Sequence, residues 1–475
     1  MLKDWNKLEV PAGEEVENRL KAAREMLLKQ QVMMKEKKLP VIVLFEGWGA
    51  AGKGSVLGKV IKNIDPRFFK VAVMDEPTEE ENRKPFLYRH FVKIPEAGKF
   101  VFMDSGWMSE VTKQKLSGEL SDEDYKKRVE SIKRFERQLT DNGYLLLKFF
   151  FNIDKKEQKK RLNKLKEDKN TKWRVSEYDK WQNKHYEECF DVYDQYLCDT
   201  DHSSAPWYIV DAKDKKWAQL QVLETIVQGI DTAFANIALS VPLLQNAFPL
   251  KPIPKLSEVS LDKELSDEEY ERLLDMYQKR LGELHNELYR KKVPVIIAYE
   301  GWDAAGKGGN IRRIAEALDP RGYEVHPIAS PEPHEKARHY LWRFWNRLPK
   351  TGHIAIFDRT WYGRVMVERL EGFCSTNDWQ RAYVEINEFE RELADWGAII
   401  VKFWVQIDKD TQLERFKDRE NTPEKRWKIT EEDYLYLWSY QHLLFLHCNS
   451  SQQILPVKTP LFLCRIKLQS FLHPC

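Results

Sequence analysis

One glycine-rich segment occurs twice in this chain: EGWGAAGKGS begins at Glu46, and EGWDAAGKGG begins at Glu300. The offset of 254 residues (300 − 46) also superposes Asp104 on Asp358. A register kept without a gap over well over a hundred residues is too long for a supersecondary repeat, so it indicates duplication of a whole domain. A chain of 475 residues has room for two such domains, each with its own core.

Apolar segments in each copy predict strands, and the second of them ends at an acid. In the first copy these segments are 41–45, 100–104 and 144–153, and in the second copy they are 293–299, 353–358 and 398–407. Charged amphipathic segments at 14–37 and 266–290 predict a helix before the first strand of each copy. Strands that alternate with helices indicate a parallel sheet with helices on both faces, an α/β fold.

The domain boundaries follow from composition and from the repeat. We expect a first domain at 1–240, a proline-rich linker at 241–256, a second domain at 257–440 and a divergent tail at 441–475. After Tyr440 the sequence no longer follows the first copy. We therefore expect the second domain to lack a sheet strand and its covering helix, which would uncover apolar surface.

The repeated segment matches the GxxxxGK pattern of a phosphate-binding loop. It follows a predicted strand and opens a predicted helix, as the pattern requires. The glycines allow successive backbone N–H groups to point at phosphate oxygens, and a lysine adds a movable positive charge. In the second copy we expect phosphate or nucleotide contacts from the loop residues Gly301, Ala304, Ala305, Gly306, Lys307, Gly308 and Gly309.

The residue after the lysine is Gly308, where Ser or Thr usually holds Mg²⁺. Another ligand is needed for the metal. Asp303 inside the loop and Asp358 at the end of the second apolar segment are the candidates, because Mg²⁺ prefers carboxylate and phosphate oxygens and retains several waters.

Basic residues follow the second and the third apolar segments of the second copy. Arg359 comes directly after Asp358, and Arg364 lies five residues later. Guanidinium groups suit phosphate oxygens and developing transition-state charge. Trp361 and Tyr362 between them are predicted to be packing residues. The segment 416–428 is dense in basic residues and suits a lid that closes over phosphates. Further candidates for binding a phosphate chain are Arg415, Lys417, Arg419, Lys425 and Arg426.

Composition excludes several functions. The 77 basic and 75 acidic residues give a net charge of +2, which argues against a general nucleic-acid binder. No apolar run is long enough to span a bilayer. The amino-terminal residues lack the pattern of a secretory signal, and the six cysteines show no metal spacing. A cytoplasmic location is expected.

The segments GWDAAGKGGNI, DPRGYEVHPIASPEPHE, FWNRLPKTGHIAIFDRTWYGRVMVERLEGF and KDRENTPEKRWKITEEDY closely resemble the polyphosphate kinase 2 family. The resemblance implies two tandem P-loop kinase-like α/β/α domains with helical lids. It also implies an enzyme that moves the terminal phosphoryl group of inorganic polyphosphate to AMP, giving ADP, with self-association possible. The implied catalytic residues are Asp303, Lys307, Asp358, Arg359, Arg364 and Arg419, with Asp303 and Asp358 on Mg²⁺.

The first copy departs from this pattern at the implied catalytic positions. Asp303, Arg359, Tyr362, Arg364 and Arg419 are replaced by Gly49, Ser105, Met108, Glu110 and Leu165, while Lys53 and Asp104 remain. We therefore expect the first copy to be weak or inert, as a scaffold or a holder of polyphosphate. Two other functions stay open: a nucleoside-triphosphate-dependent monophosphate kinase, and a noncatalytic polyphosphate-binding subunit.

Overall fold

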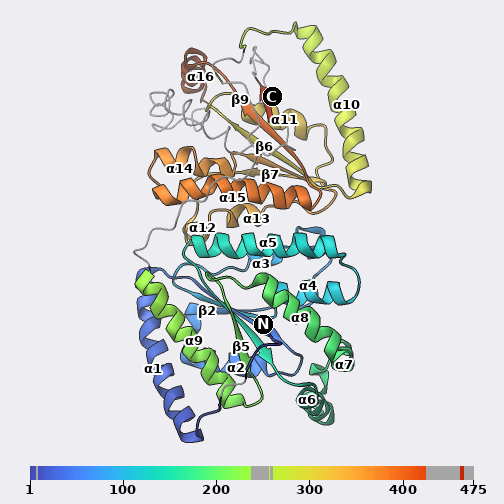
Figure 1. Cartoon of the computed structure of the whole chain (residues 1–475). Coiled ribbons are helices and arrows are strands. Elements are labelled where there is room, and N and C mark those ends of the chain that lie inside the picture. The colour runs from blue at the N-terminus through green and yellow to red at the C-terminus, as the bar shows by residue number, and fades with distance from the viewer. Residues whose placement is uncertain (7–8, 237–255, 257–259, 424–460, 465–475) are drawn as a thin grey trace. The chain divides into compact units, whose positions relative to one another are not determined.

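The computed structural model describes residues 1–6, 9–236, 256, 260–423 and 461–464 (Figure 1). The chain divides into two compact units. The first comprises Met1–Thr78, Leu87–Ser240 and Lys336–His339, and the second comprises Glu79–Phe86, Val241–Glu335 and Tyr340–Cys475. Each unit contains one five-stranded sheet in which all paired strands run parallel, so the predicted fold class is confirmed.

The first sheet has the strand order β2-β3-β1-β4-β5. Its strands are β1 (Val41–Gly47), β2 (Phe69–Val73), β3 (Phe100–Asp104), β4 (Leu145–Asn152) and β5 (Trp207–Asp211). The central strand β1 is buried from Val41 to Phe45, because helices cover both faces of the sheet. Parallel order brings the carboxyl ends of β1 and β3 to one edge, where Phe45 pairs with Asp104.

Helices form the outer layers of this first unit. They are α1 (Gly13–Lys37), α2 (Lys53–Val60), α3 (Tyr88–Phe91), α4 (Trp107–Leu116), α5 (Asp122–Asp141), α6 (Lys155–Glu167), α7 (Glu177–Lys184), α8 (Tyr186–Thr200) and α9 (Lys215–Asn236). Figure 1 shows α1 and α9 side by side, and these two helices contact each other along their length. Helices α4, α5 and α8 form a second contacting group, and together the layers make an α/β/α sandwich.

The second sheet has the order β10-β9-β6-β8-β7, which is the same topology. Its strands are β6 (Val295–Gly301), β7 (Tyr323–Pro327), β8 (Ile354–Asp358), β9 (Ile399–Val405) and β10 (Leu461–Cys464). The described helices are α10 (Asp267–Lys291), α11 (Lys307–Ala315), α12 (Pro333–Lys336), α13 (Trp342–Trp345), α14 (Val367–Leu370), α15 (Thr376–Asp395) and α16 (Lys409–Asn421).

The strands and helices predicted from apolar runs and helical periodicity are confirmed in both copies. Strands β2 and β7 were not predicted. Both lie at an open edge of their sheet, and both show the same mixed pattern of half-buried and exposed residues. An edge strand buries too little surface to produce a continuous apolar run, so the sequence carries only a weak signal for it.

The expected loss of the fifth strand in the second copy is wrong. Leu461 of β10 pairs with Lys402 of β9, and this is the register in which Trp207 of β5 pairs with Lys148 of β4. A parallel strand requires a short apolar run more than a particular sequence, and LFLC meets this requirement. The counterpart of α9 would begin at residue 469, which lies outside the described residues. The predicted linker also lies outside them, apart from residue 256.

The first helix of each copy has the same length but a different environment. The side of α1 that includes Leu20, Leu27 and Met34 is buried, and this helix contacts α9. Within the described part of the second unit, His285 is the buried residue of α10, while Met276 and Tyr277 are exposed. Equal sequence periodicity therefore predicts both helices, but only their packing partners determine how much of each is buried.

Candidate active site

The phosphate-binding loop of the second copy connects β6 to α11. Gly301 has φ +135°, and a Cβ there would lie 2.3 Å from the carbonyl oxygen of Val405. Gly306, at the start of α11, has φ +105°. Only glycine fits these two positions without strain. The loop glycines thus fix the backbone at the amino end of α11, where N–H groups are unpaired within the helix and suit phosphate.

Helix α16 supports the loop from one side. Phe416 is fully buried against Ala304, and Gln412 Nε2 donates to the carbonyl oxygen of Asp303 at 3.0 Å. Arg415 donates to the carbonyl oxygen of Ala304 at 2.9 Å. Arg161, at the corresponding position of the first copy, donates to Ala51 at 2.9 Å. Arg415 therefore shapes the loop, and a phosphate contact by Arg415 stays a prediction.

Lys307 is the buried cation of the loop. Its Nζ donates to the carbonyl oxygens of Gly301 at 2.8 Å and of Trp302 at 2.9 Å. It also lies 3.8 Å from Oδ1 of Asp303. The ammonium group is thus held at the loop beside the Asp303 carboxylate, at more than hydrogen-bond distance, where its charge can also act on an anionic ligand.

Asp303 and Arg359 form an ion pair at this loop. Arg359 Nη2 lies 2.8 Å from Asp303 Oδ1, although the two residues are 56 positions apart in the chain. Burial alone would raise the pKa of the Asp303 carboxyl, but Lys307, Arg359 and Arg419 outweigh it, and the net pKa lies below its usual value. The carboxylate is therefore ionised at neutral pH.

Asp358 and Arg359 occupy the carboxyl end of β8. Tyr299 of β6 pairs with Asp358, and the Arg359 N–H donates to the Tyr299 carbonyl at 3.0 Å. Arg359 has φ +67°, a left-handed conformation that costs energy for a residue other than glycine. Ser105 keeps the same conformation in the first copy, with φ +63°. The left-handed residue after the strand is therefore common to both copies, although its side chain differs.

Arg364 lies farther along the same turn. Its Nη1 lies 2.6 Å from Glu368 Oε2, and its guanidinium carbon lies 4.8 Å from the centre of the Tyr340 ring. Burial lowers the pKa of Arg364, but Glu368 and other acids outweigh burial, and the side chain stays charged. In the first copy the corresponding residue is Glu110, and Arg89 lies 3.6 Å from it.

The predicted lid is described only in part. Lys417 and Arg419 lie on the last turns of α16, Lys417 exposed and Arg419 half-buried. Because Phe416 is buried against the loop, the start of the predicted lid is in fact a packed helix. Lys425 and Arg426 lie outside the described residues.

Sequence reasoning missed two buried acids that anchor the Arg359 turn. Glu300 Oε1 accepts hydrogen bonds from Thr360, at 2.8 Å from its backbone nitrogen and 2.7 Å from its hydroxyl. Burial raises the pKa of the Glu300 carboxyl, and the Thr360 bonds oppose this. The second acid is Glu390, which pairs with Lys402 at 2.8 Å. A lysine inside the apolar strand IIVKFWV was the signal for a buried partner.

The corresponding loop of the first copy is occupied by its own chain. Lys53 donates to Gly47 at 3.1 Å, much as Lys307 does to Gly301. However, the Gly49 N–H donates to Gln182 Oε1 of α7 at 2.9 Å. A Cβ on Gly49 would lie 2.1 Å from Asp179 Oδ1. This copy therefore keeps the loop but fills the space where Asp303 stands in the second copy.

Restoring the missing aspartate as Gly49→Asp should destabilise the first unit and create no activity. The new carboxylate would clash with Asp179 and repel it, so we expect a loss of about 1–3 kcal/mol in unfolding free energy. Thermal unfolding, with hydrogen exchange along α7, measures this. Gly13→Asp is the matched control, because a Cβ built on Gly13 meets no described residue within 4 Å beyond its chain neighbours and the backbone of its own helix. Equal stability of the two variants would contradict the prediction.

The two candidate metal ligands fit one type of cation. No cluster of three or more His, Cys, Asp or Glu side chains suited to a metal occurs among the described residues. A protein cage is thus not formed there, but Mg²⁺ is commonly held by one or two carboxylates together with substrate phosphates and waters. The contacts of Asp303 with Lys307 and Arg359 both use Oδ1. Metal binding by Asp303 and Asp358 stays a prediction.

Comparisons with known proteins find relatives that match most of the chain. A polyphosphate:AMP phosphotransferase of Pseudomonas aeruginosa is 39% identical over 418 residues, covering 86% of this chain and 84% of that protein. The enzyme of the same name from Acinetobacter johnsonii is 36% identical over 396 residues, covering 83% of this chain and 80% of that protein. A crystal structure described as polyphosphate kinase 2 from Pseudomonas aeruginosa superposes with a TM-score of 0.82 at 35% identity, covering 98% of this chain and 94% of that one.

Two further findings bear on the class of the protein. No helix in the described part of the chain has the length and apolarity needed to cross a membrane. The family model of polyphosphate kinase 2 matches residues 12–237 and 264–441, which takes in both copies of the repeat. The chain therefore belongs to the polyphosphate kinase 2 family.

Proposed function

We propose that the second copy transfers the terminal phosphoryl group of inorganic polyphosphate to AMP, giving ADP and a polyphosphate one unit shorter. The observation that carries this proposal is the cluster of Lys307, Asp303 and Arg359 at the phosphate-binding loop. The first copy has the loop and its lysine but lacks the other two side chains. The relatives that match both copies are named polyphosphate:AMP phosphotransferases, which supports this donor and this acceptor.

The residues of the second copy would act by positioning and by charge. An α-phosphate oxygen of AMP attacks the terminal phosphorus of polyphosphate, and the bond from that phosphorus to the bridging oxygen breaks. No base is needed, because the attacking oxygen is already an anion. The loop N–H groups and Lys307 bind phosphate oxygens, while Arg359 neutralises the charge that develops during in-line transfer.

The metal proposed for this site is Mg²⁺, which would neutralise phosphate charge and hold the phosphates in line. Asp303 and Asp358 are the residues proposed to hold it. The ion pair of Asp303 with Arg359 then has a second purpose, since it places the arginine beside the same phosphates. Lys417, Arg419, Lys425 and Arg426 are proposed to bind the rest of the anionic chain, and self-association is part of the same proposal.

The proposal is tested by supplying the purified chain with AMP, Mg²⁺ and either long-chain polyphosphate or ATP, and by measuring ADP. An Asp358→Asn variant serves as the control with an impaired second copy. We expect ADP to form from polyphosphate in the wild-type protein only. ADP formation from ATP alone would instead identify a nucleoside-triphosphate-dependent monophosphate kinase. Polyphosphate binding by a folded sample with no ADP would identify a noncatalytic binding subunit.

A further inference from the structure

A buried ion pair lies beneath the turn that carries Arg359. Lys402 on β9 and Glu390 on α15 have side chains that are 2% and 0% exposed, and their charged atoms are 2.8 Å apart. Such a pair contributes little net stability, because burial of both charges offsets their attraction, whereas removal of one partner is costly. Stability alone therefore does not explain the pair. The groups that are hydrogen-bonded to it indicate what else it does.

The pair holds two consecutive aromatic residues of the turn. Glu390 Oε1 accepts a hydrogen bond from Trp361 Nε1 at 3.1 Å and another from the Tyr362 hydroxyl. Lys402 Nζ donates to that same hydroxyl at 3.1 Å. Burial and the nearby Glu390 keep the pKa of Tyr362 well above its usual value, so the phenol stays protonated and can donate. The Tyr362 hydroxyl thus links the turn to both members of the pair.

The preceding residue of the turn is fixed from another direction. Thr360 is bound to the buried carboxylate of Glu300 by two hydrogen bonds, at 2.8 and 2.7 Å. Three consecutive residues, 360–362, are therefore attached to buried acids. Arg359 directly precedes this stretch, and Arg364 follows it after one intervening residue. The arginines themselves contact Asp303 and Glu368.

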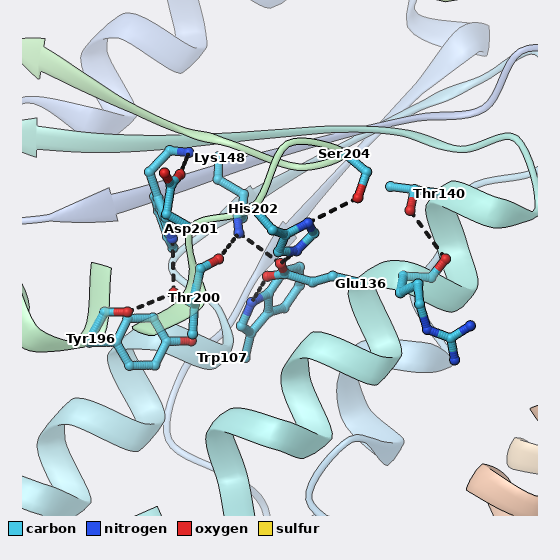
Figure 2. A network of polar contacts seen from close by, with 11 residues as sticks. Trp107, Glu136, Thr140, Lys148, Tyr196, Thr200, Asp201, His202 and Ser204 are labelled. Atoms are coloured by element: carbon cyan, nitrogen blue, oxygen red, sulfur yellow. Dashed lines mark hydrogen bonds and ion pairs between the residues drawn. The ribbon is translucent and has the colours of Figure 1, made fainter. Parts of the chain in front are cut away.

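The first copy contains the same pair without the tyrosine. The Glu136 carboxylate lies 2.9 Å from Trp107 Nε1, 2.7 Å from Lys148 Nζ and 2.8 Å from His202 Nε2, and Figure 2 shows these residues together. Met108 stands in place of Tyr362. In this copy the turn continues as the regular helix α4, whereas in the second copy it is a 3-10 turn over Trp361–Arg364. The tyrosine hydroxyl is thus present in the copy whose turn carries the two arginines and absent from the copy whose turn lacks them.

We propose that Tyr362 is a positioning residue, whose hydroxyl is held by the Lys402–Glu390 pair and fixes the turn that presents Arg359 and Arg364 to phosphate. This inference rests on the proposed function. A displacement of a phosphate-binding group by about 1 Å can cost up to about 10² in rate, so loss of the hydroxyl should be visible in turnover. The ring, the ion pair and the Trp361 bond all stay in place when only the hydroxyl is removed.

The first test is Tyr362→Phe in the full chain, assayed with AMP and polyphosphate. We expect kcat to fall about 10- to 100-fold with little change in KM for AMP. In a protein that already carries Arg359→Ser, the residue of the first copy, we expect Tyr362→Phe to cause little further loss, because the two residues act together. Equal losses in both backgrounds, or an unchanged kcat, would overturn the inference.

The second test compares Glu390→Gln with Glu136→Gln. Each substitution leaves a buried lysine without its carboxylate, so both should lower thermal stability to a similar extent. Only Glu390→Gln should lower kcat. A matching fall in kcat for Glu136→Gln would show a purely structural role and overturn the inference. Should Glu390→Gln not fold, the comparison of Tyr362→Phe in the two backgrounds still tests the inference, since that variant keeps the ion pair.

Failure of the inference can be told from failure of the proposed function. A wild-type chain that makes no ADP would refute the proposed function. An active wild type with an unaffected Tyr362→Phe variant would refute only the positioning role.

Discussion

Replacing Lys307 by Met should lower kcat for ADP formation by about 10²- to 10³-fold, the usual loss on removing one charged or hydrogen-bonding group from a phosphate transition state. Methionine has a similar length, so the loop keeps its shape. The change removes the donor to Gly301 and Trp302, at a cost of about 1 kcal/mol or more. Steady-state kinetics with saturating AMP and polyphosphate, together with a melting curve, separate the two effects.

The duplicated fold supplies a matched control for this prediction. Lys53→Met removes the corresponding lysine of the first copy, which donates to Gly47 in a similar way. Turnover should be unchanged, because this loop lacks the aspartate and the arginine of the second copy. Equal losses from the two variants would mean that the first copy also takes part in catalysis.

Replacing Asp358 by Asn should lower kcat on the order of 10³-fold, because the proposed Mg²⁺ site would lose one of two carboxylates and several kcal/mol of charge stabilisation. Asparagine keeps the size of the side chain at the end of β8. We therefore expect the fold to survive, and the concentration of Mg²⁺ for half-maximal rate to rise. A titration of the rate with Mg²⁺ in wild-type and variant protein measures this.

Asp104→Asn is the companion variant in the first copy, where the acid stands at the corresponding end of β3. It should leave both turnover and the Mg²⁺ dependence as they are in the wild type. An Asp358→Asn variant with full turnover and an unshifted Mg²⁺ titration would remove this residue from the metal site.

The sequence predicted the parts of the fold that bury long apolar runs. The central strands of both sheets and the helices α1 and α10 are located as expected, since their periodicity spans many residues. Edge strands β2 and β7 were missed because half of their surface is exposed. The fifth strand of the second sheet was wrongly dismissed. A backbone ladder accepts any short apolar segment, and loss of sequence similarity did not mean loss of the strand.

The candidate site was predicted from residue types but not from their contacts. The spacing of Asp303 and Arg359 gives no hint that they meet, because a strand order with a crossover brings them together. The buried acids Glu300 and Glu390 were also missed. Their roles depend on tertiary partners, Thr360 for one and Lys402 for the other, which no local pattern contains.

The contact of α7 with Gly49 also limits which single substitutions the first copy can accept. Asp179 and Gln182 stand in the space that a side chain at position 49 would need. An aspartate there therefore requires a compensating change in α7. The two copies share one fold, but a residue that fits the loop of the second copy cannot be exchanged singly into the loop of the first.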